Sequence, residues 1–369
     1  MDSASARVPP GRDEEVRPVI RRYLIAIALA VVALTAAAIA LLDDESADGG
    51  NAAARGPHWA SLPPSPLERT EVAAGRIGRF IYVVGGFVPP SLQTTDQVAR
   101  YDISTGTWST VAPLPVAVNH PAVAVGTGRC AGQLYVYGGY TDSGSLSGEV
   151  DALQRFDPRT GTWTRLPGSG VPRAAATLAP VGCSIYAIGG ASGGAAQRQV
   201  QVYDIRRGTW RPGPSMRIAR EHLASVAIGR RILVLGGRAA GGNLAAVEEL
   251  DTRAGKWRRL PRIPTPRSGF GAVAVRGWAV VLGGEELTPG GETIRPVEAL
   301  DPRSRRWRKL PAMLTPRHGL GVVARGPRIF AVEGGPHPGG SYSSLIESLK
   351  IPARLLPPRH GRFPQKSAG

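Results

Sequence analysis

Arginine, histidine and glutamate recur at one point of a pattern that runs through most of this 369-residue chain. Guanidinium groups pair with carboxylate or phosphate through two parallel hydrogen bonds, so several of them close together can bind an anion. Histidine and glutamate beside them can act as general acid or base. The recurring positions are Arg69-Thr70-Glu71, Asn119-His120-Pro121, Arg173-Ala174, Arg220-Glu221-His222, Arg267-Ser268 and Arg317-His318.

Two sets of candidate site residues follow from these positions. The candidate ligand-binding residues are Arg69, Arg173, Arg220, Arg267, Arg317 and His318. The candidate general acids or bases, if the protein is an enzyme, are Glu221, His222 and His120. The histidines show no pairing of ligands on one defined element, so we expect no metal site. Phosphate-binding loops, dinucleotide fingerprints and serine or cysteine nucleophile motifs are absent from the sequence, so we expect no cofactor.

The segments that carry these residues are copies of one another. An apolar run ends in a Gly-Gly pair six times, and successive first glycines are 53, 51, 47, 47 and 51 residues apart. A tryptophan precedes the first glycine of each pair by 26 to 30 residues. The pairs begin at Gly85, Gly138, Gly189, Gly236, Gly283 and Gly334, and the tryptophans are Trp59, Trp108, Trp163, Trp210, Trp257 and Trp307.

The repeat resembles that of the kelch family, in which Gly-Gly, then Tyr-Asp, then Trp recur about every 50 residues. The Tyr-Asp position reads RYD at Asp102 and VYD at Asp204, with Leu in place of Tyr at positions 250 and 300. The resemblance covers residues 58–352 and implies an all-β fold, a six-bladed kelch-type β-propeller like the central domain of galactose oxidase. Each repeat then supplies the four strands of one blade, and the recurring arginines lie around one mouth of the central channel.

The two ends of the repeat region predict how the ring closes. No tryptophan follows Trp307, so the sixth unit lacks an outer strand, whereas Trp59 precedes the first unit without strands of its own. We therefore expect the N-terminal strand HWASL, around Trp59, to complete the last blade. The sixth unit also departs from the pattern, because Glu333 stands where a hydrophobic residue is expected and Leu349-Lys350 replaces Tyr-Asp.

The resemblance leaves two interpretations of the recurring arginines open. Kelch repeats often carry Pro-Arg at this position and use the arginine to brace neighbouring blades. Alternatively, the arginines bind an anionic ligand, as in an enzyme similar to the exported six-bladed kelch mutarotases and epimerases of sialic acid. The copper site of galactose oxidase needs tyrosine and histidine ligands and a tyrosine cross-linked to a cysteine, and no comparable set occurs here. We expect a ligand- or protein-binding scaffold, with an enzyme acting on an anionic sugar at the channel mouth as the alternative.

The chain has two cysteines, Cys130 and Cys183, and we expect them to form a disulfide bond. Both lie in the connection between the first and second strands, in consecutive units. The lengthened connection GTGRCAG carries Cys130 toward its neighbour. Two cysteines of an exported chain can oxidise outside the cytoplasm. The alternative is a pair of free cysteines that behave as small hydrophobic side chains.

Residues 23–42 form an uncharged apolar run that is long enough to cross a membrane as one helix. Arginines precede this run and acidic residues follow it, so the positive-inside rule places residues 1–22 in the cytoplasm and the propeller outside. A cleaved signal peptide is the alternative, although its apolar region is usually shorter. We expect an uncleaved signal anchor, a flexible linker over residues 43–57 and a basic, proline-rich, disordered tail over residues 353–369.

The composition restricts the partners that we expect. The net charge is +17, but only four of the 45 basic residues are lysines, and such arginine usage is typical of a GC-rich bacterial genome. No aromatic-basic stripe or nucleic-acid module is visible, so we expect no nucleic-acid partner. The remaining candidates are the membrane and an unknown protein or an anionic glycan or cell-wall polymer. We expect a monomer, held in the cytoplasmic membrane by a single pass.

Overall fold

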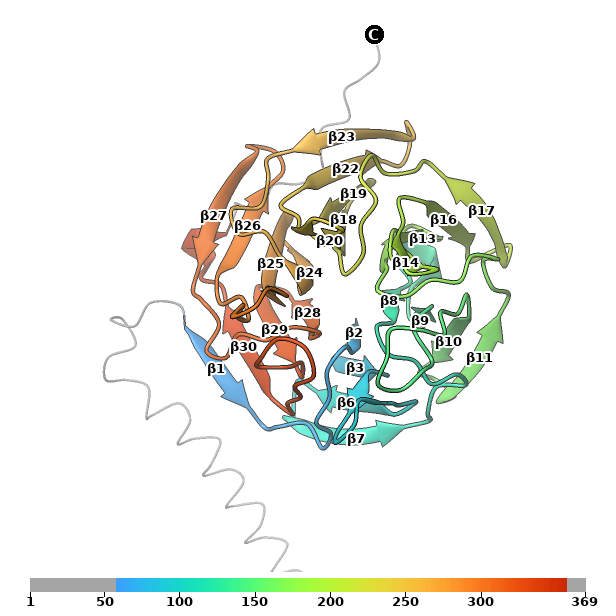
Figure 1. Cartoon of the computed structure of the whole chain (residues 1–369), viewed down its shortest axis with the longest axis horizontal. Helices are drawn as coiled ribbons and strands as arrows, with labels where there is room; N and C mark the ends of the chain where they lie inside the picture. The colour runs from blue at the N-terminus through green and yellow to red at the C-terminus, as the bar shows by residue number, and fades with distance from the viewer. Residues whose placement is uncertain (1–57, 357–369) are drawn as a thin grey trace, which may run out of the picture. The chain divides into compact units, whose positions relative to one another are not determined.

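The structure, a computed structural model, describes residues 58–356, which form a ring of six four-stranded antiparallel sheets around a central channel (Figure 1). Each sheet is one blade of a β-propeller, so the predicted all-β, six-bladed fold is confirmed. The predicted signal anchor over residues 23–42 and linker over residues 43–57 lie outside the described residues. Within residues 58–356, no helix has the length and apolar character that crossing a membrane requires.

Each blade runs from an inner strand at the channel to an outer strand at the circumference. Blades one to three contain β2 (Ala73–Ile77), β3 (Phe80–Val84), β6 (Val98–Asp102) and β7 (Thr107–Val111); β8 (Ala122–Val125), β9 (Leu134–Tyr137), β10 (Leu153–Asp157) and β11 (Thr162–Leu166); β12 (Thr177–Val181), β13 (Ser184–Ile188), β16 (Val200–Asp204) and β17 (Thr209–Gly213). Blades four to six contain β18 (Ala224–Ile228), β19 (Arg231–Leu235), β22 (Val247–Asp251) and β23 (Lys256–Leu260); β24 (Ser268–Val275), β25 (Trp278–Glu285), β26 (Val297–Asp301) and β27 (Arg306–Leu310); β28 (Gly321–Arg325), β29 (Arg328–Val332), β30 (Ile346–Lys350) and β1 (Trp59–Leu62).

The ring closes through β1, which is the outer strand of blade six although it is the first of the described strands. It pairs with β30 in an antiparallel register that places Trp59 opposite Leu349. The Trp59 side chain is buried, and its indole N–H donates to the Pro311 carbonyl of blade five at 2.9 Å. The predicted closure by the HWASL segment is therefore confirmed, and the closed ring leaves no unpaired edge between its first and last blades.

The tryptophans link neighbouring blades around the whole circumference. In each outer strand the indole N–H donates to a backbone carbonyl just after the outer strand of the preceding blade, at 2.8–3.0 Å. The acceptors, taken in the order of the tryptophans along the chain, are the carbonyls of Pro311, Pro63, Ala112, Pro167, Pro214 and Pro261. Because this bond needs a tryptophan in every blade, the regular spacing of these residues in the sequence follows from it.

The hydrophobic core lies between the blades rather than within any one of them. One cluster, for example, joins Tyr82 and Val84 of blade one to Leu134 and Phe156 of blade two. Burial of apolar surface at about 25 cal/mol per Å² is the main stabilising contribution of such contacts. Near the channel, Gly271 of β24 has no room for a side chain, because a Cβ added there would lie 2.0 Å from Val322 of β28.

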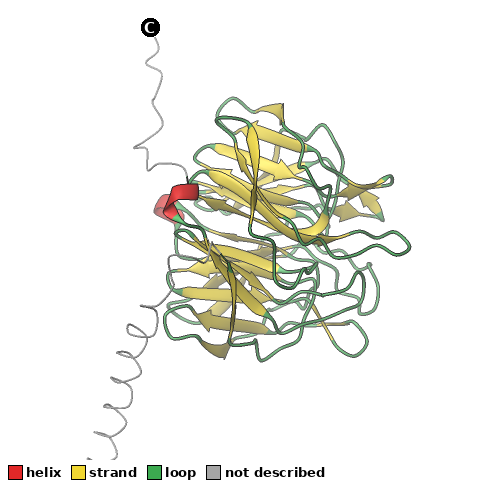
Figure 2. Cartoon of the chain, turned by 90° about the vertical axis from the view of Figure 1, so that its left-hand side faces the viewer, coloured by secondary structure: helices red, strands yellow, loops and turns green. Residues whose placement is uncertain are grey.

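The propeller has two different faces, which Figure 2 shows from the side. The loop face carries the long connections after the second strands, which include the two-stranded ribbons β4–β5 (Phe87–Val88, Gln93–Thr94), β14–β15 (Ala191–Ser192, Ala195–Ala196) and β20–β21 (Arg238–Ala239, Gly242–Asn243). The hairpin face carries the short turns between first and second strands and between third and fourth strands. Strand β1 begins, and β30 ends, at the hairpin face, where the Ile351 amide donates to the Pro327 carbonyl.

The predicted start of the disordered tail at residue 353 is too early. Residues Ala353–Leu355 form the short 3-10 helix η2, and the following side chain, Leu356, is buried against blades five and six. Burial of this apolar side chain stabilises the segment, although the basic, proline-rich sequence around it is typical of a disordered tail. The remaining part of the predicted tail, residues 357–369, lies outside the described residues.

Candidate functional site

Five fully buried arginines hold the base of the loop face, and we call them the clamp arginines: Arg69, Arg173, Arg220, Arg267 and Arg317. Each guanidinium donates to the backbone carbonyl sixteen residues further on, at the first position of the Gly-Gly pair of its own blade. The donor–acceptor distance is 3.0 Å for Gly189 and 2.9 Å for Gly283. Each clamp arginine therefore fixes the point at which the second strand ends and the long loop begins.

Most of the clamp arginines also face a buried carboxylate. The nitrogen–oxygen distances are 2.9 Å for Arg220–Glu248, 2.7 Å for Arg267–Glu298, 3.2 Å for Arg317–Glu347 and 2.8 Å for Arg69–Glu333. Among the described residues, no carboxylate pairs with Arg173, whose Nη1 reaches only the carbonyls of Gly189 and Gln199. Burial of a guanidinium is costly, and these pairs and carbonyls offset part of that cost.

Blades two and six depart from this arrangement in informative ways. Blade two has Val118 where the others have arginine, and Gln154 where blades four to six have glutamate. In blade six Glu333 has the positive φ of a first glycine (φ 55°), and Gly334 that of a second (φ 94°). The glycine pair that we assigned as Gly334-Gly335 is therefore Glu333-Gly334 in the structure. Glu333 replaces a glycine, not a hydrophobic residue, because its carboxylate binds Arg69 of blade one.

The clamp arginines thus occupy the bracing position that the family resemblance suggested. Their side chains have no exposed surface, and their guanidiniums face carbonyls and carboxylates of the blades. None of the five can be reached by a ligand from the channel or from the loop face in this structure. Sequence spacing placed them correctly at one height around the axis, but spacing does not reveal whether a side chain points into the blade or into the channel.

At the second residue after each clamp position, the chain turns toward the channel. We call the six residues at this position the channel ring: Glu71, His120, Ala175, His222, Gly269 and Gly319. All six have φ between 48° and 61°, in the left-handed region that non-glycine residues rarely occupy. Their backbones are joined blade to blade, since each amide from His120 to Gly319 donates to the preceding ring carbonyl at 2.8–3.1 Å. The Val72 amide closes this circle on the Gly319 carbonyl at 3.0 Å.

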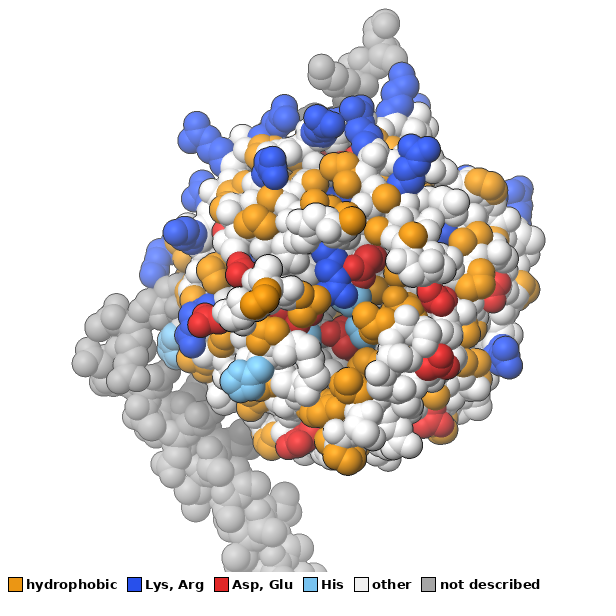
Figure 3. Space-filling view, in the orientation of Figure 1, with side chains coloured by type: hydrophobic (Ala, Val, Ile, Leu, Met, Phe, Trp, Pro, Cys, Tyr) orange, Lys and Arg blue, Asp and Glu red, His pale blue; other side chains and the backbone are white. Residues whose placement is uncertain are grey.

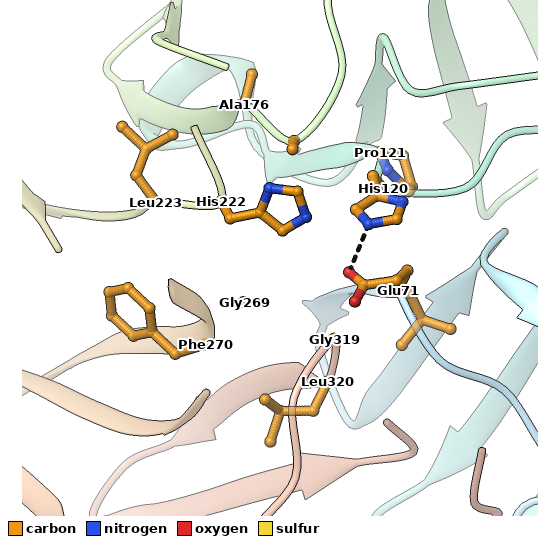
Figure 4. A pocket seen from close by; sticks show the side chains of 12 residues that line it. Glu71, His120, Pro121, Ala176, His222, Leu223, Gly269, Phe270, Gly319 and Leu320 are labelled. Carbon is orange, nitrogen blue, oxygen red and sulfur yellow. Dashed lines mark ion pairs between the residues drawn. The ribbon is translucent and has the colours of Figure 1, made fainter. Parts of the chain in front are cut away.

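Glutamate and histidine side chains from the channel ring meet on the axis of the propeller (Figure 4). One Glu71 carboxylate oxygen lies 3.2 Å from His120 Nε2, and the other lies 3.5 Å from His318 Nε2. The rings of His120 and His222 stack edge to face with centroids 4.8 Å apart. Gly319 makes room for this cluster, because a Cβ there would lie 2.7 Å from the Glu71 carboxyl carbon.

A second layer of charged groups covers the cluster on the loop side. Arg238 donates to Glu221 at 2.5 Å, and its Nη1 lies 3.6 Å from a Glu285 oxygen. The other Glu285 oxygen lies 3.7 Å from His318 Nε2. Glu221 also pairs with Nδ1 of His222. Figure 3, which looks onto the loop face, shows basic, acidic and histidine side chains gathered around the central hollow.

The environment of the channel shifts the protonation equilibria of these groups in opposite directions. Burial, together with the nearby Glu285 carboxylate, raises the pKa of Glu71 to about 8. Burial lowers the pKa of His120 and His222 well below the usual value, and Arg238 adds to this effect. Burial also lowers the pKa of His318. Burial therefore favours the uncharged form of the three imidazoles and the protonated form of the Glu71 carboxyl group.

Sequence spacing identified part of this cluster. It placed Glu221, His222 and His120 together as candidate acids or bases and added His318, and the structure brings all four to the channel. It did not select Arg238 and Glu285, although each is the first residue after a Gly-Gly pair. The first residue after the Gly-Gly pair forms a β-bridge with the residue after the clamp, as Arg238 does with Glu221. This pairing within the repeat could have identified Arg238 and Glu285 as neighbours of the cluster.

The space beside the cluster is small. The cavity lined by Glu71, His120 and His222 has a volume of about 90 Å³. A separate cavity of about 160 Å³ lies further along the channel between the inner strands. Pockets that bind small organic ligands usually measure about 300–1,000 Å³. The cavity at the cluster therefore has room for an ion and a few water molecules.

The predicted disulfide between Cys130 and Cys183 is present, with Cα atoms 5.3 Å apart. Cys130 ends the short 3-10 helix η1 (Gly128–Cys130), and Cys183 lies in the turn between β12 and β13. The bond joins the hairpin face of blade two to that of blade three. It thus reinforces the part of the ring in which blade two has no clamp arginine and Arg173 has no carboxylate partner.

Comparison with known proteins agrees with this architecture. Residues 71–217 match the KLHDC2/KLHL20/DRC7 Kelch-repeats domain, and residues 219–264 match the Kelch motif. Kelch-like protein terF of Aspergillus terreus is 34% identical over 143 residues, which are 36% of this chain and 30% of that protein. Kelch-like protein 35 of Mus musculus is 39% identical over 111 residues, 30% of this chain and 18% of the relative.

A third relative, Kelch-like ECH-associated protein 1A of Danio rerio, is 30% identical over 129 residues, 35% of this chain and 19% of that protein. The matched segments span less than a third of the length of each of these relatives. The two family matches together cover residues 71–217 and 219–264, which hold the greater part of blades one to four. The chain belongs to the kelch-repeat family.

Proposed function

We propose that the propeller is a non-enzymatic scaffold that binds a protein partner on its loop face. The observation that carries this proposal is the position of the exposed apolar side chains. Among the described residues, the large hydrophobic side chains that are exposed are Leu146, Leu287 and Leu314, with 51%, 52% and 46% of their surface accessible. All three belong to connections on the loop face. Exposed apolar side chains surrounded by polar ones are typical of surfaces that bind proteins.

The scaffold beneath these leucines is suited to such a role. The loops begin at points fixed by the clamp arginines, so the ring holds them in place while their tips stay accessible. The name of one relative, Kelch-like ECH-associated protein 1A, records an association with ECH, which supports a protein as the class of partner. An enzyme acting on an anionic sugar receives less support, because the arginines required to bind the sugar are buried.

Site-specific photocrosslinking in cells that make the full-length protein tests this proposal. A photoreactive amino acid at position 146, 287 or 314 should give an adduct of one defined mass, and the same label at Arg159 or Arg207 on the hairpin face should not. Leu146→Ser, Leu287→Ser and Leu314→Ser combined should abolish the adduct formed from a neighbouring loop position, without a change in melting temperature. Adducts that form equally from both faces, or that survive the triple substitution, would refute partner binding on the loop face.

We further propose that residues 23–42 anchor the chain, with the propeller outside the cytoplasm and its hairpin face toward the membrane. The disulfide supports an oxidising compartment. The hairpin face supports the orientation, because its acidic residues are turn aspartates that are not exposed, whereas its basic residues are exposed. These basic residues are Arg79, Arg129, Arg159, Arg206, Arg207, Arg230, Arg231, Arg253, Lys256, Arg276, Arg303, Arg305, Arg306, Arg325 and Arg328. Each basic side chain near an anionic membrane contributes about 1 kcal/mol of attraction.

Protease protection and vesicle binding test these two parts separately. The anchor predicts that full-length protein stays in the membrane pellet after alkaline washing and that external protease removes the propeller. A soluble mature form that begins after residue 42 would contradict the anchor. The orientation predicts that substitution of Arg206, Arg207, Arg305 and Arg306 by glutamine weakens attachment of a chain lacking residues 23–42 to anionic vesicles, while neutral vesicles bind neither form.

A further inference from the structure

Side chains from three different blades converge in the channel with the spacing of a metal site (Figure 4). One donor atom each of Glu71, His120 and His222 lies within 4.8 Å of the other two. The closest approach is 3.2 Å, between His120 Nε2 and a Glu71 oxygen. In a tetrahedral site with bonds of about 2.0–2.1 Å, neighbouring donor atoms lie about 3.4 Å apart. Small adjustments of His222 would therefore complete such a site.

The hydrogen bonds behind the histidines orient them as metal ligands. Nδ1 of His120 lies 2.6 Å from Asn119 Oδ1, which can only accept, and Nδ1 of His222 faces the Glu221 carboxylate. The proton of each neutral imidazole is therefore held at Nδ1, away from the channel. The lone pair at Nε2 then points inward, and this is the arrangement in which an outer carboxylate or carbonyl fixes a metal-binding histidine.

The charge around the cavity also favours a cation. Three acidic side chains, Glu71, Glu221 and Glu285, face the channel, and one guanidinium, that of Arg238, lies among them. The acidic groups around the cavity therefore outnumber the basic one. The Arg238 Nη2 lies 3.3 Å from His222 Nε2, so an ion must displace this one contact, while Arg238 keeps both of its carboxylate partners.

We propose that the channel binds one divalent transition-metal ion through His120 Nε2, His222 Nε2 and the carboxylate of Glu71. Two imidazoles and one carboxylate suit zinc and its neighbours, whereas calcium and magnesium prefer oxygen ligands alone. Three protein ligands leave one position for water, and the adjoining cavity of about 90 Å³ provides the space. From the sequence we expected no metal site, because no two ligands lie on one element. In the structure the three ligands come from three elements, in blades one, two and four.

A second grouping shares Glu71 and must be separated from the first. Glu71, Glu285 and His318 also bring donor atoms within 4.8 Å of one another. His318 donates from Nδ1 to the Gly335 carbonyl at 3.1 Å, so its Nε2 also faces Glu71. This grouping offers only one imidazole, which makes it the weaker ligand set for zinc. The two groupings predict different effects of substitutions at positions 120 and 318.

Metal titration of the full-length protein, first stripped with a chelator, tests the proposal. Zinc binding followed by calorimetry, and cobalt binding followed by its visible absorption, should each show one ion per chain. Glu71→Gln, which keeps the shape of the side chain, and His120→Ala or His222→Ala should weaken binding by more than the about 10–100-fold typical of losing an outer partner. Glu221→Gln and Asn119→Leu should fall within that smaller range.

Matched controls come from the same face of the propeller. His337→Ala and Glu286→Gln remove an imidazole and a carboxylate from exposed loops and should leave both titrations unchanged. If His318→Ala abolishes binding while His120→Ala does not, the ion lies in the second grouping and the proposed ligand set is wrong. Absence of stoichiometric binding at micromolar zinc, or binding that Glu71→Gln leaves intact, would overturn the metal site itself.

Discussion

In each repeat the clamp position and the channel-ring position lie two positions apart, yet their side chains behave in opposite ways. The clamp position is arginine in five blades, and every one of these side chains points into a blade and is buried. The channel-ring position reads Glu, His, Ala, His, Gly and Gly, and its larger side chains meet on the axis. The clamps repeat because five of the six blades use the same brace. The channel ring varies because one site on the axis needs different groups from different blades.

This difference separates structural from functional residues within one repeat protein. A position that is the same in every repeat meets a need of each blade, as the tryptophans also do. A position that changes from repeat to repeat, while its backbone stays in one strained conformation, is free to build a site. Non-glycine residues at positive φ cost of order 1–3 kcal/mol, and they persist where the surrounding structure determines them.

Removal of β1 should have the largest effect, because this strand completes blade six and closes the ring of blades. Deletion of residues 58–62 exposes the edge of β30 and removes the buried Trp59. We expect cooperative unfolding to be lost, so that the circular dichroism and fluorescence transitions no longer coincide. Deletion of residues 43–53 serves as the control and should leave the transition unchanged. Equal melting temperatures for the two deletions would contradict closure by β1.

Loss of a single clamp should be the next largest effect. Arg267→Ala leaves Glu298 buried without its partner, and we expect the free energy of unfolding to fall by about 3–5 kcal/mol. Arg173→Ala leaves only carbonyls unsatisfied and should cost about 1–3 kcal/mol. Arg262→Ala, an exposed arginine on the same face, should stay within about 0.5 kcal/mol of the unsubstituted protein. Urea unfolding measures all three, and equal values for Arg267→Ala and Arg262→Ala would refute the bracing role.

The disulfide should contribute most where the clamps are weakest. Its removal by Cys130→Ser and Cys183→Ser together should lower the free energy of unfolding by about 2–4 kcal/mol. We also expect Arg173→Ala to cost more in this background than in the disulfide-bonded protein, because both features hold blade three. A double-mutant cycle measured by urea unfolding provides the comparison. Strict additivity would show that the disulfide and the clamp act independently.

Substitution of Glu71 in the channel ring should raise the stability of the protein, whereas substitution of a clamp arginine should lower it. The Glu71 carboxyl has its pKa raised from 4.5 to about 8, because burial and the facing Glu285 outweigh the facing Arg238. The folded state therefore holds this proton more tightly, and the protein loses stability as pH rises from about 4.5 to about 8. Glu71→Gln removes that loss. His120 and His318, which also face Glu71, are retained in the variant.

We therefore expect Glu71→Gln to match the unsubstituted protein near pH 5 and to exceed its stability near pH 8.5 by on the order of 1–3 kcal/mol. Thermal unfolding in the presence of a chelator, at both pH values, measures the difference without interference from metal ions. Glu286→Gln, on an exposed loop, should show no such pH dependence. A stability difference between Glu71→Gln and the unsubstituted protein that stays constant with pH would contradict the protonated state of Glu71.

The sequence predicted those features that depend on spacing. The Gly-Gly pairs and tryptophans predicted six blades and the closing strand, and the extra residues before Cys130 predicted the disulfide. The interpretation of Glu333 was wrong. Gly334 and Gly335 have the sequence of a glycine pair, but the backbone conformation shows that the pair position is occupied by Glu333 and Gly334. The end of the ordered chain was also misplaced, because the burial of Leu356 depends on a surface built by distant blades.

The candidate site was harder to predict, because it depends on direction as well as spacing. Spacing placed Arg220 and His222 at the same height, but one side chain enters the blade and the other enters the channel. Arg238 and Glu285 reach the same cluster from positions that follow the glycine pairs, eighteen residues after the clamp arginines of their blades. The strained backbone that turns the channel ring inward has no signature in residue type, since glutamate, histidine and alanine all adopt it.

The position of β1 also determines the order in which the protein can fold. This strand is made first, but its indole bond joins Trp59 to Pro311, 252 residues later in the chain. The last blade therefore waits for the entire repeat region to be synthesised before it gains its outer strand. Pairings of such long range slow folding and leave strand edges open to other chains in the meantime. Until β1 pairs with β30, the outer edge of β30 has no partner strand within its own blade.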